Sequence, residues 1–204
     1  MRKNALTIIC ALICLILLII LIVGLIEKSA YINDCQEIRL HSSYCENLFG
    51  LTPKEFCKSK GKGTEIENRY TYAKTDKDGY LILRMTDGQI SRWRNSRADV
   101  RILQAVLGDK RDIGVKIIEE ENPINAVFIE HADTCGYDIS EDYKLITISS
   151  DDDVFYLSAI ASACMFMQIT SGIPSDEASV EYVRFDKDGN ETNRQIVSYI
   201  DANK

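Results

Sequence analysis

The chain has 204 residues, and its 24 basic and 31 acidic residues give a formal net charge of −7 at pH 7. An acidic protein is repelled by polyphosphate, which argues against nucleic-acid binding. Only three prolines and no low-complexity run argue against a disordered chain.

The first hydrophobic stretch, residues 5–26, contains no charged residue and is interrupted only by Thr7 and Gly24. At about 1.5 Å per residue it forms a helix of about 33 Å, which matches the ~30 Å hydrocarbon core of a bilayer. A helix also satisfies its own backbone polar groups in lipid. The stretch therefore predicts a transmembrane anchor.

A cleaved signal peptide is the main alternative, although its apolar region usually has about 7–15 residues. The best cleavage site, after Ala30, has Lys28 where a small residue is required. A lipoprotein signal is disfavoured because isoleucine precedes both Cys10 and Cys14. We therefore favour an uncleaved anchor.

The charges that flank this stretch predict its orientation. Arg2 and Lys3 precede it, and Lys28 follows it beside Glu27. Positive charge is retained in the cytoplasm. We expect residues 1–4 inside the cell and the residues that follow the anchor outside. Without Arg2 and Lys3, the chain has 22 basic and 31 acidic residues, so the outer part has a net charge of −9.

Residues 27–50 are interpreted as a juxtamembrane stalk, and residues 51–204 as one domain. The domain opens with a helix-start pattern in which Thr52 caps, Pro53 takes the first helical position and Glu55 completes a capping box. Gly61 ends this helix.

Further elements follow from periodicity and turn residues. Residues 70–85 predict a hairpin around the turn at 76–79. Thr86 and Gln89 form a second capping box, and apolar residues continue at helical spacing to Leu107. Beyond it we expect a strand over 115–119, a helix from Asn122 to Gly136, and a strand over 143–149.

Residues 154–169 are apolar nearly all round, which is typical of a buried helix. They are too few and too polar for a second span. A closing hairpin of residues 180–185 and 192–200 completes the chain. This order favours an α+β class, with a single domain in which helices cover one mostly antiparallel sheet.

The tetrapeptide Asp-Lys-Asp-Gly occurs at 76–79 and again at 186–189, which is weak evidence for two related hairpins. The second copy resembles the start of a calcium loop. Such a loop needs Gly and Glu where this chain has Glu191 and Val197. We interpret it as a solvated turn.

No pattern predicts catalysis, a metal or a cofactor. His131 and Cys135 are one helical turn apart and could share zinc with Cys35, His41 or Cys45, but the tight ligand pairs of zinc sites are missing. The acidic run at 151–153 is explained by the helix that it precedes. No nucleophile motif or phosphate-binding loop is present, so we expect no enzymatic activity.

Two other sets of residues are candidate sites. One disulfide is expected among Cys35, Cys45 and Cys57, with Cys35–Cys57 as the first choice because it ties the stalk to the helix begun at Thr52. Arg94, Arg97 and Arg101 share a face of one predicted helix and could bind an anionic polymer, lipid headgroups or an acidic partner. We favour the alternative, a solvated face paired with the excess acid.

The sequence therefore predicts a single-pass protein, held in the bilayer by residues 5–26, whose outer domain has a binding, sensing or scaffolding role. Two alternatives are a membrane-anchored enzyme with an unrecognised site and a regulatory domain that faces the cytoplasm.

Overall fold

The computed structural model describes residues 2–108, 111–115, 136–149 and 157–198. The chain divides into two compact units, Met1–Cys35 and Gln36–Lys204. The predicted helix from Asn122 up to Gly136, the predicted strand over 115–119 beyond Val115, and the acidic run 151–153 lie outside the described residues, as do His131 and Cys135.

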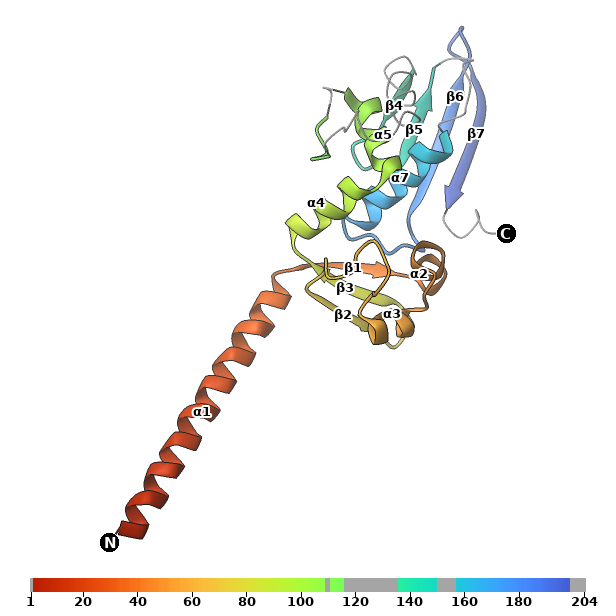
Figure 1. The fold of residues 1–204 in the computed structure, drawn as a ribbon. Helices are drawn as coiled ribbons and strands as arrows, with labels where there is room; N and C mark the ends of the chain where they lie inside the picture. The colour runs from red at the N-terminus through yellow and green to blue at the C-terminus, as the bar shows by residue number, and fades with distance from the viewer. Residues whose placement is uncertain (1, 109–110, 116–135, 150–156, 199–204) are drawn as a thin grey trace. The chain divides into compact units, whose positions relative to one another are not determined.

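The first unit is the helix α1, Arg2–Asn33 (Figure 1). It continues past the predicted end at Ile26. Every large apolar side chain from Ile13 to Ile26 is 47–62% exposed. Residues Ile13–Asn33 are long and apolar enough to cross a membrane, a property that a signal sequence shares. The helix thus indicates membrane anchoring or secretion.

The second unit begins with a three-stranded antiparallel sheet. Its strands are β1 Gln36–Leu40, β2 Tyr72–Thr75 and β3 Leu81–Met85, in the order β1-β3-β2. Helices α2, Ser42–Phe49, and α3, Pro53–Ser59, lie between β1 and β2 in the chain. Residues 36–50, interpreted from the sequence as part of a stalk, therefore form a strand and a helix of the folded unit.

The two predicted capping boxes are confirmed. In α3 the Thr52 side chain accepts from the backbone of Glu55, whose carboxylate accepts from the Thr52 backbone in return. Thr86 and Gln89 make the same pair of bonds at the start of α4, Asp87–Ser96. Each box satisfies backbone N–H groups that a helix start leaves without partners.

The prediction of one helix from Thr86 to Leu107 is wrong. Arg97 is extended, with φ −93° and ψ 127°, and separates α4 from α5, Ala98–Leu107. This break lets the Arg97 guanidinium bind Asp99 through two hydrogen bonds of 3.0 and 2.8 Å. Residues two apart do not face each other on a continuous helix, so the ion pair requires the break.

The expectation of one sheet is also wrong, because a second sheet follows. It contains β4 Tyr137–Ile139, β5 Leu145–Ile148, β6 Ser179–Phe185 and β7 Glu191–Ser198, in that order. β5 and β6 are parallel, and all other pairs are antiparallel. Parallel neighbours need a crossover, which contains helix α7, Leu157–Ile169. The α+β class is confirmed.

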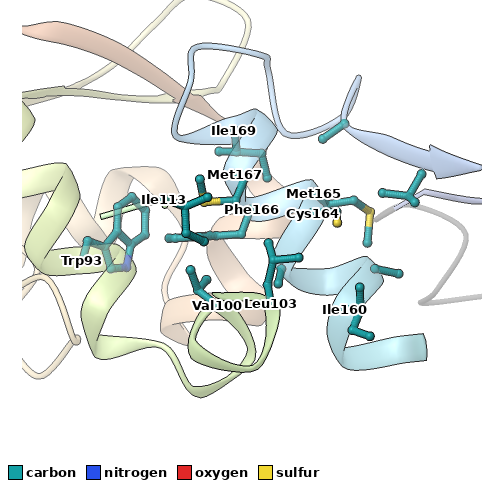
Figure 2. Close-up of a cluster of buried hydrophobic side chains, with 14 of the residues drawn as sticks. Trp93, Val100, Leu103, Ile113, Ile160, Cys164, Met165, Phe166, Met167 and Ile169 are labelled. Carbon is teal, nitrogen blue, oxygen red and sulfur yellow. The ribbon is translucent and has the colours of Figure 1, made fainter. Parts of the chain in front are cut away.

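Helix α7 lies at the centre of the hydrophobic core, as its composition predicts (Figure 2). Phe166 packs edge-on against Trp93 of α4, with ring centroids 4.8 Å apart. Ile160, Cys164 and Ile169 are fully buried. The same core includes Leu83 of the first sheet and Ile146 of the second.

The two Asp-Lys-Asp-Gly segments form the same local structure. Asp76 Oδ1 accepts from the backbone N of Asp78 and Tyr80, and Asp186 Oδ1 accepts from those of Asp188 and Asn190. Each carboxylate therefore closes its own hairpin turn. The interpretation of residues 186–190 as a hairpin turn is confirmed.

Candidate functional site

A cavity of about 260 Å³ opens on the face of the first sheet that points away from the core. Its lining comes from the three strands and the β2–β3 turn: Glu37, Arg39, Lys74, Asp76, Lys77, Asp78 and Ile82. Arg39 and Lys74 are both registered against Ile82 of the central strand. These three residues therefore form one row across the sheet, with the buried Ile82 in the middle.

The sequence forms this face by alternation. In β1 the side chains of Ile38 and Leu40 point into the core and are fully buried, so Glu37 and Arg39 point to the opposite face. In β3, Leu81 and Leu83 are fully buried in the same way. The cavity is thus the polar side of a sheet whose apolar side holds the domain together.

Arg39 is held in place by an aromatic ring. Its guanidinium carbon lies 4.9 Å from the centroid of the Tyr80 ring, a cation–π contact. The Tyr80 hydroxyl donates to Asp176 Oδ2 at 2.5 Å, and this bond is the main reason that the pKa of Tyr80 rises to about 12. Asp176 therefore fixes Tyr80, and Tyr80 supports Arg39.

The loop that carries Asp176 is fixed to the end of β1. The Ser175 backbone N donates to the Arg39 carbonyl at 3.0 Å, and the His41 backbone N donates to Ser175 Oγ at 2.7 Å. The His41 ring also meets Tyr80 edge-on, with centroids 5.4 Å apart. The site is thus assembled from segments that are distant in sequence and rigidly joined.

The carboxylates of the cavity already have internal partners. Asp76 accepts the two backbone bonds of its turn through Oδ1, and its Oδ2 lies 3.3 Å from Arg39 NH2. Glu37 pairs with Arg84 at 2.6 Å. Asp78, exposed at the turn, is the third carboxylate of the lining. Two of the three acids therefore have little capacity left for a ligand.

The cations of the cavity have more capacity. Within the described part of the chain, Lys74 and Lys77 are exposed and make no hydrogen bond or ion pair. The Arg39 side chain, which is 37% exposed, makes one hydrogen bond, at 3.3 Å to Asp76. A guanidinium carries five N–H donors. The cavity therefore presents mainly hydrogen-bond donors and positive charge.

A second cavity, of about 280 Å³, is lined by Glu141, Asp142, Tyr143, Lys144, Gln168, Ser171 and Ile173. Its central polar groups serve the fold. Gln168 Nε2 donates to the carbonyls of Tyr143 and Ser179 at 2.9 and 2.8 Å, and Ser171 Oγ accepts from Arg94. Tyr143 has a φ of 61°, and its ring packs under the Arg111 guanidinium at 4.5 Å. We therefore regard the first cavity as the candidate site.

The arginines of the predicted patch make hydrogen bonds mostly to other groups of the protein. Arg94 Nε donates to Thr170 Oγ1 at 2.8 Å, and Arg101 NH1 donates to the Asn95 carbonyl at 2.9 Å. Arg97 binds Asp99, whose carboxylate also accepts from Ser162 of α7. Because α4 ends before Arg97, the three arginines do not share one helix. A role for them in partner binding stays a prediction.

No disulfide forms among the cysteines of the described residues. Cys35 Sγ lies 3.4 Å from the Tyr31 carbonyl in the first unit, and Cys57 Sγ lies 3.7 Å from Thr75 Oγ1 in the second. Burial, followed by the neighbouring Cys57, raises the pKa of Cys45 to about 12. The Cys35–Cys57 bridge stays a prediction.

Among the described residues, no group of three or more His, Cys, Asp or Glu side chains is arranged to hold a metal ion. No protein-family model matches the chain, no curated protein matches its sequence, and no solved structure matches its fold.

Sequence reasoning missed the candidate site because it missed β1. The segment Glu37-Ile38-Arg39-Leu40 alternates between polar and apolar residues, which is the signal of a half-buried strand. That signal covers only a few residues beside a long apolar stretch. The contact with Asp176 could not be predicted, since it joins residues far apart in the chain.

Proposed function

We propose that this protein is a single-pass membrane protein whose amino terminus lies in the cytoplasm and whose folded unit, Gln36–Lys204, binds a ligand outside the cell. The exposed apolar surface of α1 supports the anchor, because large side chains from Ile13 to Ile26 would otherwise be left in water. Arg2 and Lys3 before the helix support the orientation.

The observation that carries the binding role is the rigid support of Arg39 at the first cavity. A partly exposed cation that is supported by Tyr80 and Asp176, and whose guanidinium makes a single hydrogen bond, is arranged to receive a ligand rather than to stabilise a strand. Among the described residues, the lining includes no serine, cysteine or histidine that could act as a nucleophile. The composition of the cavity thus favours binding over catalysis.

Fractionation and proteolysis of cells that produce the full chain test the anchor and its orientation. We expect the protein to stay in membranes after a carbonate wash, to keep its original amino terminus, and to be cut by protease added to intact cells. A cytoplasmic protein that remains uncut serves as the control for cell integrity.

Two results would contradict the proposal. Release of a soluble chain that begins near Tyr31 would identify residues before it as a signal peptide. Protection of the folded unit in intact cells, with cleavage after lysis, would place it in the cytoplasm and favour the regulatory alternative.

A further inference from the structure

We propose that the cavity lined by Arg39, Lys74 and Lys77 binds a phosphate group, either that of a lipid headgroup or that of a soluble molecule. The inference rests on the proposed function, in which this cavity is the ligand site, and it adds the chemical class of the ligand. It follows from which polar groups of the cavity are already used and which are not.

The unpaired polar groups of the cavity differ in charge from the chain as a whole. The whole chain has a net charge of −7, yet the unused polar capacity of this cavity is mostly positive. Glu37 is paired with Arg84, and Asp76 is bonded to Arg39 and to the turn backbone. Lys74 and Lys77 have no such partner within the described residues. A ligand that complements this lining is therefore an anion.

The two strand cations of the cavity flank one residue of the central strand. Arg39 and Lys74 lie on the two outer strands, each registered against Ile82 of the strand between them. Neighbouring strands are about 4.8 Å apart, so the two backbones are separated by about 10 Å. Two long cationic side chains can meet above Ile82 from opposite sides. An anion bound there would accept hydrogen bonds from both sides.

The arrangement of the three cations fits a phosphate group better than a carboxylate. A carboxylate has two oxygens in one plane, which suits a single guanidinium. A phosphate group has acceptor oxygens in several directions and a larger charge. It can therefore accept from Arg39 on one side while Lys74 and the turn residue Lys77 approach from the other.

Titration of the full chain in neutral detergent micelles with inorganic phosphate tests the inference by calorimetry. We expect saturable binding by the natural protein. Arg39→Gln and Lys74→Gln should each weaken it about tenfold, because each removes a charge-assisted hydrogen bond. Lys54→Gln, an exposed position on α3 away from the cavity, is the matched control and should bind as tightly as the natural protein.

Lys77→Gln keeps the test decisive if a strand variant fails to fold. Lys77 is exposed in the turn, and its removal should also weaken phosphate binding. Absence of saturable binding by the natural protein, or equal affinity in the cavity and control variants, would overturn the inference. Either result with the membrane topology intact leaves the anchored, outward-facing part of the proposed function standing.

A reconstitution experiment separates the two sources of phosphate. The chain is placed in phosphatidylcholine vesicles with or without phosphatidylglycerol and titrated again with inorganic phosphate. A headgroup ligand would compete, so that phosphatidylglycerol weakens the apparent affinity of the natural protein but not the residual affinity of Arg39→Gln. Equal affinities in the two vesicles and in detergent micelles that contain no phosphate would assign the site to a soluble phosphate compound.

Discussion

The two apolar helices, α1 and α7, have similar compositions and opposite surroundings. The described apolar side chains of α1 are exposed from Ile13 to Ile26, whereas ten of the thirteen residues of α7 are buried within the folded unit. At about 1.5 Å per residue, α7 is about 20 Å long, too short for a ~30 Å hydrocarbon core. Length therefore separates a helix that the membrane can cover from one that the protein must cover.

The polar residues of α7 strengthen this contrast. Ser162 donates to Asp99 at 2.9 Å, and Gln168 donates to two backbone carbonyls. These bonds satisfy polar groups that would be costly to bury alone. A buried helix in a folded domain can contain such residues because its neighbours supply partners, whereas a single span in lipid has none beyond itself.

The largest effect is expected for Phe166→Asp in α7. Phe166 is 1% exposed, packs on Trp93 and lies under the Arg97 guanidinium, so the change removes core packing and buries a carboxylate in its place. We expect a loss of about 5 kcal/mol or more in the free energy of unfolding, measured in urea. Ser158→Asp, at an exposed position of the same helix, should cost less than about 0.5 kcal/mol. A stable Phe166→Asp protein would mean that this side of α7 is not core.

The next prediction is that a charge in α1 weakens membrane insertion without changing the stability of the folded unit. Leu18→Arg puts a charge in the middle of the apolar part of α1 and should disfavour membrane insertion by about 3 kcal/mol. The unfolding of the Gln36–Lys204 unit should stay unchanged. Membrane fractions after a carbonate wash measure the first quantity, and Leu18→Phe is the control. An altered unfolding midpoint with normal membrane retention would show that α1 packs on protein instead.

A smaller effect is expected from overpacking. Ala163 is fully buried in α7, and Ala163→Leu should cost about 1–3 kcal/mol because the added atoms force neighbouring side chains from their positions. Ala159 is only partly buried and provides the matched variant Ala159→Leu, for which we expect a smaller loss. Thermal unfolding compares the two. Equal melting temperatures for both variants would contradict the tighter packing of the helix face that contains Ala163.

The smallest effect concerns alkaline pH. Burial raises the pKa of the Cys164 thiol to about 12, from an ordinary value of 9.0. Well below pH 9 the Cys164 thiol is protonated in both the folded and the unfolded state. Between pH 9 and 12 the unfolded state loses its proton first, so the stability of the folded state falls as pH rises. We expect Cys164→Ala to reduce this fall by about 1 kcal/mol at pH 10, measured against its own stability at pH 8.

Cys45 and Tyr80 also have raised pKa values, so some alkaline loss of stability should persist in that variant. An identical pH dependence in the two proteins would indicate that Cys164 ionises freely. It would therefore contradict the burial of this face of α7.

Local patterns predict much of this protein. The capping boxes at Thr52 and Thr86, the two Asp-Lys-Asp-Gly turns, and the apolar character of α1 and α7 could all be recognised, because each depends on residues within a few positions of one another. The α+β class followed from the order of these elements. The long apolar helix, which could be a membrane anchor or a signal sequence, followed from length and the absence of charge.

Contacts between distant residues decided the rest. β1 is a strand only because β3 pairs with it, and β5 lies parallel to β6 only because α7 provides a crossover. The placing of Arg39 over Tyr80 depends on the distant Asp176. The bend at Arg97 depends on its neighbour Asp99, which Ser162 of α7 holds by a hydrogen bond. No periodicity in a short stretch of sequence encodes such contacts.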